Sequence, residues 1–194
     1  MNHITLFSLI APYYNFTYNS QKKKYRKYLK ENSGKIPEKT KRILDVGCGT
    51  GALAYVLNES GYEVTATDAS SVMLKFARFN LRKTSVRTVK SDLTKVLPFE
   101  DKSFDLITSA YVLHGFKKEI RYRFYKEIKR VAKKAVLFHE FFPNRSFLIS
   151  FIEWLERSDY FYFVHNGREE LEQNFSYVKS IRVSPSSGWY ICYV

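Results

Sequence analysis

A glycine-rich segment directly after an apolar run, ILDVGCGTGALA at residues 43–54, constrains the fold of this chain more than any other feature. The run RILDVG at 42–47 is typical of a buried parallel strand, and 51–60 carry apolar residues at helical spacing. A glycine-rich turn between a strand and a helix lets the backbone approach a ligand closely. We therefore expect an α/β fold that holds a dinucleotide, a nucleoside triphosphate or another nucleoside-bearing cofactor at this turn.

The rest of the chain continues the alternation of strand and helix. The further predicted segments are strands at 62–68, 86–92, 104–113 and 135–141, and helices at 70–83 and 117–133. Repeated strand–helix–strand units build a parallel sheet with helices on both faces. A helical insert is expected over 143–175, and two last strands flank residues 184–188, so that one strand of the sheet becomes antiparallel.

Composition narrows the class of protein. The 194 residues suit one domain, and 45% hydrophobic with 26% charged residues is ordinary for a globular protein. We expect no membrane span and no signal peptide, because no apolar run approaches ~18 residues and the start lacks a basic segment before a cleavage site. Cys48 and Cys192 are too few for a disulfide framework or a zinc site. We expect a cytoplasmic protein without a metal ion, in which both thiols are buried.

The net charge of +13 is concentrated in two segments. Residues 22–42 contain ten Lys and Arg against two Glu, and residues 117–134 contain nine against two. Such segments can bind an anionic partner such as RNA or a lipid surface. They can equally be solvated helix faces, and the helix over 117–133 is expected to pack on the sheet with its charges outward.

The residues around the glycines distinguish among these three kinds of nucleoside-bearing ligand. A triphosphate loop needs a Lys and a Ser or Thr after its last glycine, but Gly51 is followed by an alanine and a leucine. A dinucleotide loop has the spacing GxGxxG, whereas Gly47, Gly49 and Gly51 form GxGxG. Asp45, two residues before the first glycine, would oppose a pyrophosphate and suits a cationic ligand. S-adenosylmethionine is such a ligand, since it carries a sulfonium and an ammonium group and no phosphate.

Two further acids fall at the ends of predicted strands. Asp68 ends the second strand, where a carboxylate can accept from both hydroxyls of a ribose. Asp92 ends the third, where it can accept from an adenine amino group. Together with Asp45, these acids lie at the edge of an open α/β sheet where ligands bind.

Four segments, in order and spacing, resemble a known family: ILDVGCGTGALA, TATDAS, KSDLTKVLPFEDKSFDLITSAYVLHGF and AVLFHEFFP. Over about residues 43–142 the chain is similar to the class I S-adenosylmethionine-dependent methyltransferases. The resemblance implies a Rossmann-like three-layer sandwich with a mostly parallel seven-stranded sheet of order 3-2-1-4-5-7-6, in which strand 7 is antiparallel. It also implies a single methyltransferase domain over 1–194, with S-adenosylmethionine as cofactor and S-adenosylhomocysteine as product.

The resemblance also implies roles for residues at matching positions. The implied cofactor-binding residues are Asp45, Gly47, Cys48, Gly49 and Gly51 at the methionine part, Asp68 with the adjacent Ala69 at the ribose, Met73, Asp92 and Leu93 at the adenine, and Ser109 and Ala110 beside the methyl donor. Several have a purely structural alternative. Asp45 can cap a turn, Asp68 can cap the next helix, and Met73 can belong to the core, as a Met on an apolar helical face usually does.

The N-terminal segment LFSLIAPYYNFTYN is similar to the opening of the ubiquinone/menaquinone biosynthesis methyltransferases. Tyr14 matches a tyrosine of that group, whereas Asn15 stands where the group has Asp. The resemblance implies that residues 1–40 form a helical arm over the cofactor site, and it makes Tyr14 a candidate catalytic residue.

Methyl transfer from a sulfonium is an in-line displacement, so the enzyme mainly positions the nucleophile and excludes water. If a base is needed, His114 after the fourth strand is the main candidate, and His139 and Glu140 in the fifth strand are others. His139 is expected to pack within its strand. Aromatic residues in and beside the insert over 143–175 are predicted to line a substrate lid, or to form core beneath it: Phe142, Phe147, Trp154, Tyr160 and Phe163.

Three functions stay open. The favoured one is methyl transfer to a small or lipid-like molecule; the others are an RNA- or protein-directed methyltransferase that uses segments 22–42 and 117–134, and a non-catalytic cofactor-binding module. The fourth strand ends in SAYV, not in the Asn/Asp-Pro-Pro-aromatic motif of enzymes that methylate amino groups of bases. Neither cysteine follows a proline, as cytosine C5 methylation requires. The sequence predicts neither the acceptor atom nor the oligomeric state.

Overall fold

The computed structural model describes residues 3–142 and 159–194. Within these residues the chain forms one sheet in the order β3-β2-β1-β4-β5-β7-β6. The strands are β1 (Arg42–Val46), β2 (Glu63–Asp68), β3 (Arg87–Lys90), β4 (Phe104–Ala110), β5 (Ala132–Phe141), β6 (Tyr177–Arg182) and β7 (Ser187–Tyr193). The first five strands pair in parallel, and β7 runs antiparallel to both β5 and β6. The predicted sheet order and its antiparallel strand are confirmed.

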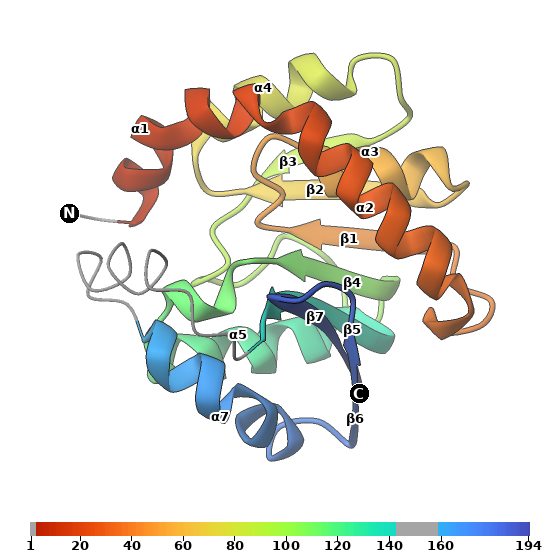
Figure 1. The fold of residues 1–194 in the computed structure, drawn as a ribbon, viewed down its shortest axis with the longest axis vertical. Helices are drawn as coiled ribbons and strands as arrows, with labels where there is room; N and C mark the ends of the chain where they lie inside the picture. Colours follow the sequence, from red (N-terminus) through yellow and green to blue (C-terminus); the bar gives the residue numbers. More distant parts are fainter. Residues whose placement is uncertain (1–2, 143–158) are drawn as a thin grey trace.

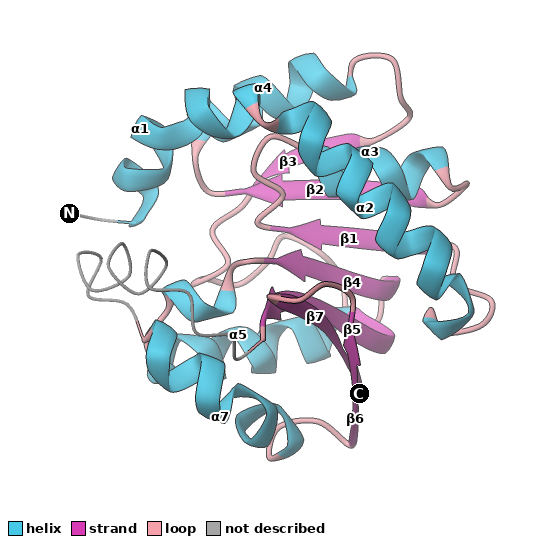
Figure 2. Ribbon diagram, viewed as in Figure 1, coloured by secondary structure: helices cyan, strands magenta, loops and turns pink. Residues whose placement is uncertain are grey.

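Helices lie on both faces of the sheet (Figures 1 and 2). They are α1 (His3–Phe16), α2 (Tyr18–Asn32), α3 (Ala52–Glu59), α4 (Ser71–Leu81), α5 (Lys118–Val131) and α7 (Tyr160–Glu172), with short 3₁₀ turns η1 (Ser33–Lys35) and η2 (Leu113–Gly115). Alternate residues of β1 enter two separate cores: Ile43 packs with α2, α3 and α4, and Leu44 packs with α5 and α7. This alternation makes the central strand apolar on both faces, as expected for a buried parallel strand.

Local sequence accounts for where the elements begin and end. Ser70 caps α4, because its side-chain oxygen accepts a hydrogen bond from the Met73 amide at 3.2 Å. Tyr111 ends β4 in a left-handed conformation with φ +58°, which no strand residue adopts. The predicted strand over 104–113 is therefore three residues too long.

The N-terminal arm consists of α1, α2 and η1. The helix α1 lies beside α4, and α2 crosses the sheet beside α3 (Figure 1). The arm is bonded to α4, because the Ser8 and Ser70 hydroxyls lie 2.9 Å apart and the Asn80 side-chain amide donates to Asn15 Oδ1 at 3.0 Å. Over the described ranges, none of the helices has the length and apolar character to cross a membrane.

One prediction about the charged segments needs correction, because the charges of α5 do not all point outward: the Arg121 side chain is fully buried. The aromatic residues were predicted either to line a lid or to form core, and Phe163 of α7 is a core residue, buried with residues of α5. Phe147 and Trp154 lie outside the described residues.

Candidate cofactor and active site

The loop after β1 bends because three of its glycines adopt left-handed backbone angles: φ is +73° at Gly47, +55° at Gly49 and +86° at Gly51. A Cβ atom at Gly47 would lie 2.7 Å from Val112, and one at Gly51 would lie 2.8 Å from Leu81, so both glycines are needed for packing. A Cβ at Gly49 would meet no atom within 4 Å. The middle of the loop therefore faces open space, where a ligand can approach the backbone.

Asp45 lies in β1 directly before this loop and is buried, with 1% of its surface exposed. Its Oδ1 accepts a hydrogen bond from the Thr108 hydroxyl at 2.9 Å, whereas its Oδ2 is buried without a hydrogen-bond partner among the described residues. Burial raises the pKa of Asp45 to about 7, and the nearby Asp68 adds to the rise. A buried carboxylate oxygen without a partner is costly, and a cationic group from a ligand would relieve that cost.

Asp68 ends β2 and links the glycine loop to the start of α4. Its Oδ2 accepts from the Gly49 amide at 2.9 Å, and its Oδ1 accepts from the Ser70 amide at 2.8 Å. Burial raises the pKa of Asp68, and these backbone amides oppose the rise. The carboxylate thus holds the loop in place, and each oxygen retains a lone pair that a ribose hydroxyl can use.

The predicted adenine-side residues lie at the ends of β2 and β3. Asp92 Oδ1 accepts from the backbone amide and the hydroxyl of Thr94, at 2.9 and 2.7 Å, so it closes the local turn. Met73 is buried at the inner side of α4, with 2% of its surface exposed. Ala69 and Leu93 are half-buried in the same loops. Asp68 therefore also has the structural role that was expected as its alternative, Asp92 has a local turn-closing role, and Met73 is largely enclosed.

The end of β4 places small residues beside the loop. Ser109 is fully buried and its hydroxyl has no hydrogen-bond partner, while Ala110 is half-buried. Tyr111 follows, with its hydroxyl 3.1 Å from Nε2 of His139 in β5. His139 is 1% exposed, and burial lowers its pKa to about 3, so its ring is neutral. His139 therefore packs within its strand, as the sequence suggested.

His114 and Glu140 form a pair at the carboxyl ends of β4 and β5. Nδ1 of His114 lies 2.8 Å from Glu140 Oε2. The other oxygen of this fully buried carboxylate accepts from the Val112 and Leu113 amides at 2.8 and 2.7 Å. Because a carboxylate held by two amides accepts from the ring, His114 carries its proton on Nδ1, which leaves Nε2 as the basic nitrogen. The ring also packs against Phe141 and Tyr160, with centroids 5.0 and 5.8 Å away.

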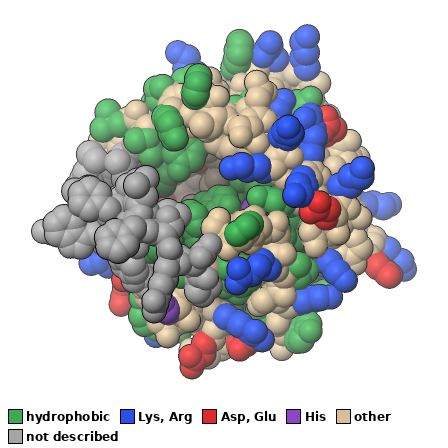
Figure 3. Space-filling view, viewed as in Figure 1, with side chains coloured by type: hydrophobic (Ala, Val, Ile, Leu, Met, Phe, Trp, Pro, Cys, Tyr) green, Lys and Arg blue, Asp and Glu red, His purple; other side chains and the backbone are tan. Residues whose placement is uncertain are grey.

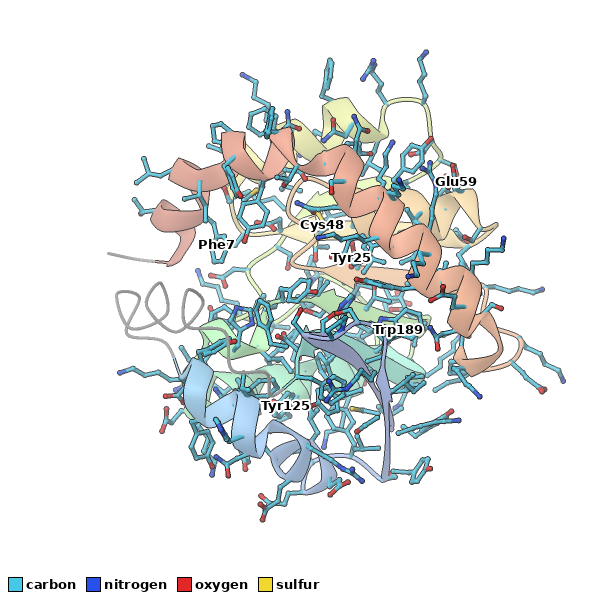
Figure 4. The ribbon with its side chains drawn as sticks, viewed as in Figure 1. Phe7, Tyr25, Cys48, Glu59, Tyr125 and Trp189 are labelled. Carbon is cyan, nitrogen blue, oxygen red and sulfur yellow. The ribbon has the colours of Figure 1, made fainter. Side chains whose placement is uncertain are left out.

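Tyr14 lies on α1 and approaches this part of the molecule from the arm. Burial raises the pKa of Tyr111 to about 12, and the charges of Tyr28, Glu140 and Tyr14 add to the rise. Burial likewise raises the pKa of Tyr25 on α2, with contributions from Tyr111, Asp45 and Tyr14. In Figure 4, Tyr25 extends from α2 toward the strand ends and Cys48 lies in the loop beneath the arm. Tyr14 is therefore near Tyr111 and Tyr25, at the aromatic end of the site.

The space-filling view shows a hollow in the region where Figure 1 places the glycine loop and the strand tips (Figure 3). Hydrophobic side chains form much of its visible rim. The predicted site residues thus gather at one edge of the sheet, where the carboxyl ends of β1, β2 and β4 meet. Within the described ranges, no group of three or more His, Cys, Asp and Glu side chains is arranged to hold a metal ion.

Sequence reasoning missed two members of this site, Thr108 and Tyr111. Thr108 pairs in register with Asp45 across β1 and β4, and its hydroxyl donates a hydrogen bond to that carboxylate at 2.9 Å. A polar residue inside an apolar strand next to an acidic one was the available signal. The sequence does not predict the left-handed backbone conformation of Tyr111, because tyrosine rarely adopts that conformation.

Comparison with known proteins agrees with this geometry. Residues 44–138 match the family model described as "Methyltransferase domain". Over these residues the chain is similar to S-adenosylmethionine-dependent methyltransferases. It is 32% identical over 114 residues to a demethylmenaquinone methyltransferase of Renibacterium salmoninarum, which covers 57% of this chain and 46% of that protein. The chain therefore spans less than half the length of this relative.

Two other relatives span most of the chain. An uncharacterized methyltransferase of Staphylococcus carnosus is 24% identical to this chain, in an alignment that covers 94% of this chain and 87% of that protein. The crystal structure of a SAM-dependent methyltransferase from Aquifex aeolicus superposes with a TM-score of 0.68 at 20% identity, over 85% of this chain and 88% of that one. At that identity the likeness to the solved structure shows the shared fold.

The residues present fit the cofactor of this class. S-adenosylmethionine carries positive charge on its sulfonium and ammonium groups, and the unpartnered Oδ2 of Asp45 supplies a buried anionic acceptor beside the glycine loop. The open space at Gly49 leaves room for close approach to the backbone. The loop offers no lysine to a phosphate, which separates this site from a triphosphate site.

Proposed function

We propose that this protein transfers a methyl group from S-adenosylmethionine to a small or lipid-like molecule. The observation that carries the proposal is the buried Asp45 carboxylate with one unpartnered oxygen, at the strand end that precedes the open glycine loop. When bound, S-adenosylmethionine supplies an electrophilic methyl group. Asp45 and the loop from Gly47 to Gly51 would hold its methionine part, and Asp68 its ribose.

The proposal also gives the other predicted residues their roles. Asp92, Leu93 and Met73 would border the adenine, and Ser109 and Ala110 would lie beneath the reacting centre. The arm over 1–40 would cover the cofactor. Its support is the hydrogen bond from Asn80 to Asn15, because the same amide group also donates to the Thr50 carbonyl in the glycine loop at 3.0 Å.

The His114–Glu140 pair supports a proton-bearing acceptor, such as a hydroxyl or an amine. Glu140 orients the ring through Nδ1 at 2.8 Å, so Nε2 would take the proton that the acceptor atom loses. Glu140 acts through His114 and is a positioning residue. The surrounding aromatic rings of Phe141, Tyr160 and Tyr111 favour an apolar or aromatic substrate body.

Methyl-labelled S-adenosylmethionine, incubated with the purified protein and fractionated cell extract, tests the proposal. We expect label in the metabolite or lipid fraction. Label in RNA or protein would favour the macromolecule-directed alternative, and tight cofactor binding without any transfer would favour a non-catalytic module. The proposal includes a cytoplasmic location, which fractionation of cells that express the tagged chain would check.

The role of His114 needs its own measurement. His114→Gln should lower the maximal transfer rate on the order of a hundredfold while leaving cofactor affinity unchanged. Glu140→Gln should shift the pH dependence of the rate, because it changes the tautomer and basicity of the ring. An unchanged rate in His114→Gln would remove the base from the mechanism.

A further inference from the structure

The helix α1 exposes an apolar stripe on its outer face. Leu9, Tyr13 and Phe16 follow each other at spacings of four and three residues, so they lie on one face of the helix. Their side chains are exposed to 67%, 68% and 87%. Single exposed apolar residues are ordinary on a protein surface, but a row of three large ones on one helix is not.

The neighbouring helix α4 extends this surface with alternating apolar and cationic residues. Val72, Lys75, Phe79 and Arg82 are exposed at helical spacing along its outer side. The Arg82 guanidinium lies over the Phe79 ring, 4.1 Å from its centroid. Since α1 and α4 lie side by side, the two rows form one surface, which we call the α1–α4 face (Figures 1 and 3).

The charge of the segments that build this face has one sign. Residues 69–91, which include α4, contain six Lys and Arg and no Asp or Glu, and α1 contains no Asp or Glu. A positive field over exposed apolar side chains is complementary to an anionic, partly apolar surface. Figure 3 shows green and blue side chains together along the edge formed by α1 and α4.

We propose that the α1–α4 face binds the surface of a bilayer that contains anionic lipids. The apolar stripe of α1 enters the interfacial region, and the cations of α4 pair with the headgroups. RNA fits less well, because the residues of α1 include no Lys or Arg and present the aliphatic Leu9 and Pro12 between the rings. Rings that stack on bases are usually interleaved with cations that meet phosphates.

The biological role of this face rests on the proposed function, whereas the vesicle-binding experiment that tests the face does not. The same helix that exposes Tyr13 outward carries Tyr14 toward Tyr111 and the site. A protein bound through α1 would therefore have its site entrance beside the bilayer, where a lipid-like acceptor resides. Vesicle binding itself requires neither the cofactor nor an acceptor, so it can succeed or fail independently of methyl transfer.

Co-sedimentation with vesicles tests the proposal. The full chain should bind vesicles of phosphatidylcholine and phosphatidylglycerol in equal amounts, and bind pure phosphatidylcholine weakly. The triple variant Leu9→Ser, Phe16→Ser and Phe79→Ser should lose at least about tenfold in affinity for the mixed vesicles. Neutralising Lys75, Arg78 and Arg82 with glutamine should cost on the order of a hundredfold, and added salt should remove the difference.

A matched control removes an exposed ring elsewhere. Tyr177 begins β6 and is exposed to 61%, far from α1 and α4 (Figure 1), so Tyr177→Ser should bind vesicles like the unaltered chain. Calorimetry with S-adenosylhomocysteine checks that each variant is folded. Equal vesicle binding by the triple serine variant, no binding by the unaltered chain, or single-stranded RNA binding in preference to vesicles would each overturn the proposal.

Discussion

Asp45 shows how a side chain that is costly for folding can serve binding. Its pKa of about 7 in the folded protein lies well above the ordinary value for aspartate. Between those two pH values the folded state keeps a proton that the unfolded state has lost, so stability falls as pH rises from about 4 to 7. Above pH 7 the carboxylate is charged in the folded protein, and its buried Oδ2 still lacks a partner.

Asp45→Asn should therefore stabilise the ligand-free protein at pH 8, by about 1 to 3 kcal/mol in the free energy of unfolding. The gain should shrink toward pH 5, where the native carboxyl is protonated. The same variant should bind S-adenosylmethionine at least about tenfold more weakly, because a neutral amide does not attract a cation. Urea unfolding at both pH values and calorimetry would check this; a stability change that is the same at pH 5 and pH 8 would contradict it.

Gly49 and Gly61 offer a comparison of two glycines with similar backbones. Both have positive φ, +55° and +93°, and a Cβ would meet no atom within 4 Å at either position. Alanine at either should thus cost about 1 kcal/mol of stability through backbone strain. Of these two glycines, only Gly49 lies in the loop that we propose to hold the cofactor, so only Gly49→Ala, and more strongly Gly49→Val, should weaken cofactor binding. Similar losses of affinity in Gly49→Ala and Gly61→Ala would show that strain alone is responsible.

These side chains also show what a sequence can predict of a site. The positions of Asp45, Asp68 and the loop glycines could be predicted because a strand end and a turn restrict the backbone locally. The partner of Asp45 could not, since Thr108 is 63 residues away and meets it only through strand register. The pairing of His114 with Glu140 likewise depends on how β4 and β5 align their ends.

At the scale of the helices, a buried ion pair joins α5 and α7. The many Lys and Arg residues of α5 do not indicate which of them forms it. Arg121 Nε and Nη2 donate to the two oxygens of Glu170, each at 2.7 Å, and the Tyr125 hydroxyl donates to the same carboxylate at 2.8 Å. A helical periodicity indicates which face is apolar, but it does not reveal an arginine that reaches a partner 49 residues later. The order of strands and helices was predictable because their hydrophobic periods differ; this contact was not.

Glu170→Gln should destabilise the protein by about 3 to 5 kcal/mol, because it removes the main counter-ion of the buried Arg121 and leaves only the partly exposed Asp159, 3.4 Å from Nη1. The same helix supplies a control: Arg168 and Glu172 are an exposed pair at 2.8 Å, and Glu172→Gln should change stability by no more than about 0.5 kcal/mol. Chemical denaturation of both variants at one ionic strength makes the comparison. Equal effects would mean that the Arg121–Glu170 pair is not a structural link between α5 and α7.

At the scale of the whole protein, the net charge of +13 raises the question of how many cations are available to bind a polyanion. Several cations of the basic segments are already engaged: Arg26 pairs with Glu59 at 2.6 Å, Arg130 with Glu127 at 2.6 Å, and Arg121 is buried. The Lys134 ammonium donates to the carbonyls of Glu38 and Lys39, each at 2.9 Å. These contacts leave fewer cations of segments 22–42 and 117–134 available to a polyanion than the sequence count suggests.

We therefore expect RNA binding to be weak and to fall steeply with salt, on the order of a hundredfold between low and physiological ionic strength. Excess RNA should not inhibit methyl transfer to a small acceptor at physiological salt, because releasing the counter-ions of the phosphates is less favourable there and RNA binding is weak. Replacing Lys22, Lys23 and Lys24 with glutamine should weaken RNA binding further and leave that transfer rate unchanged. Filter binding across a salt series, run beside the transfer assay, provides both readouts. Methyl transfer into RNA that is lost in this variant would show instead that the basic arm guides a nucleic-acid substrate to the site.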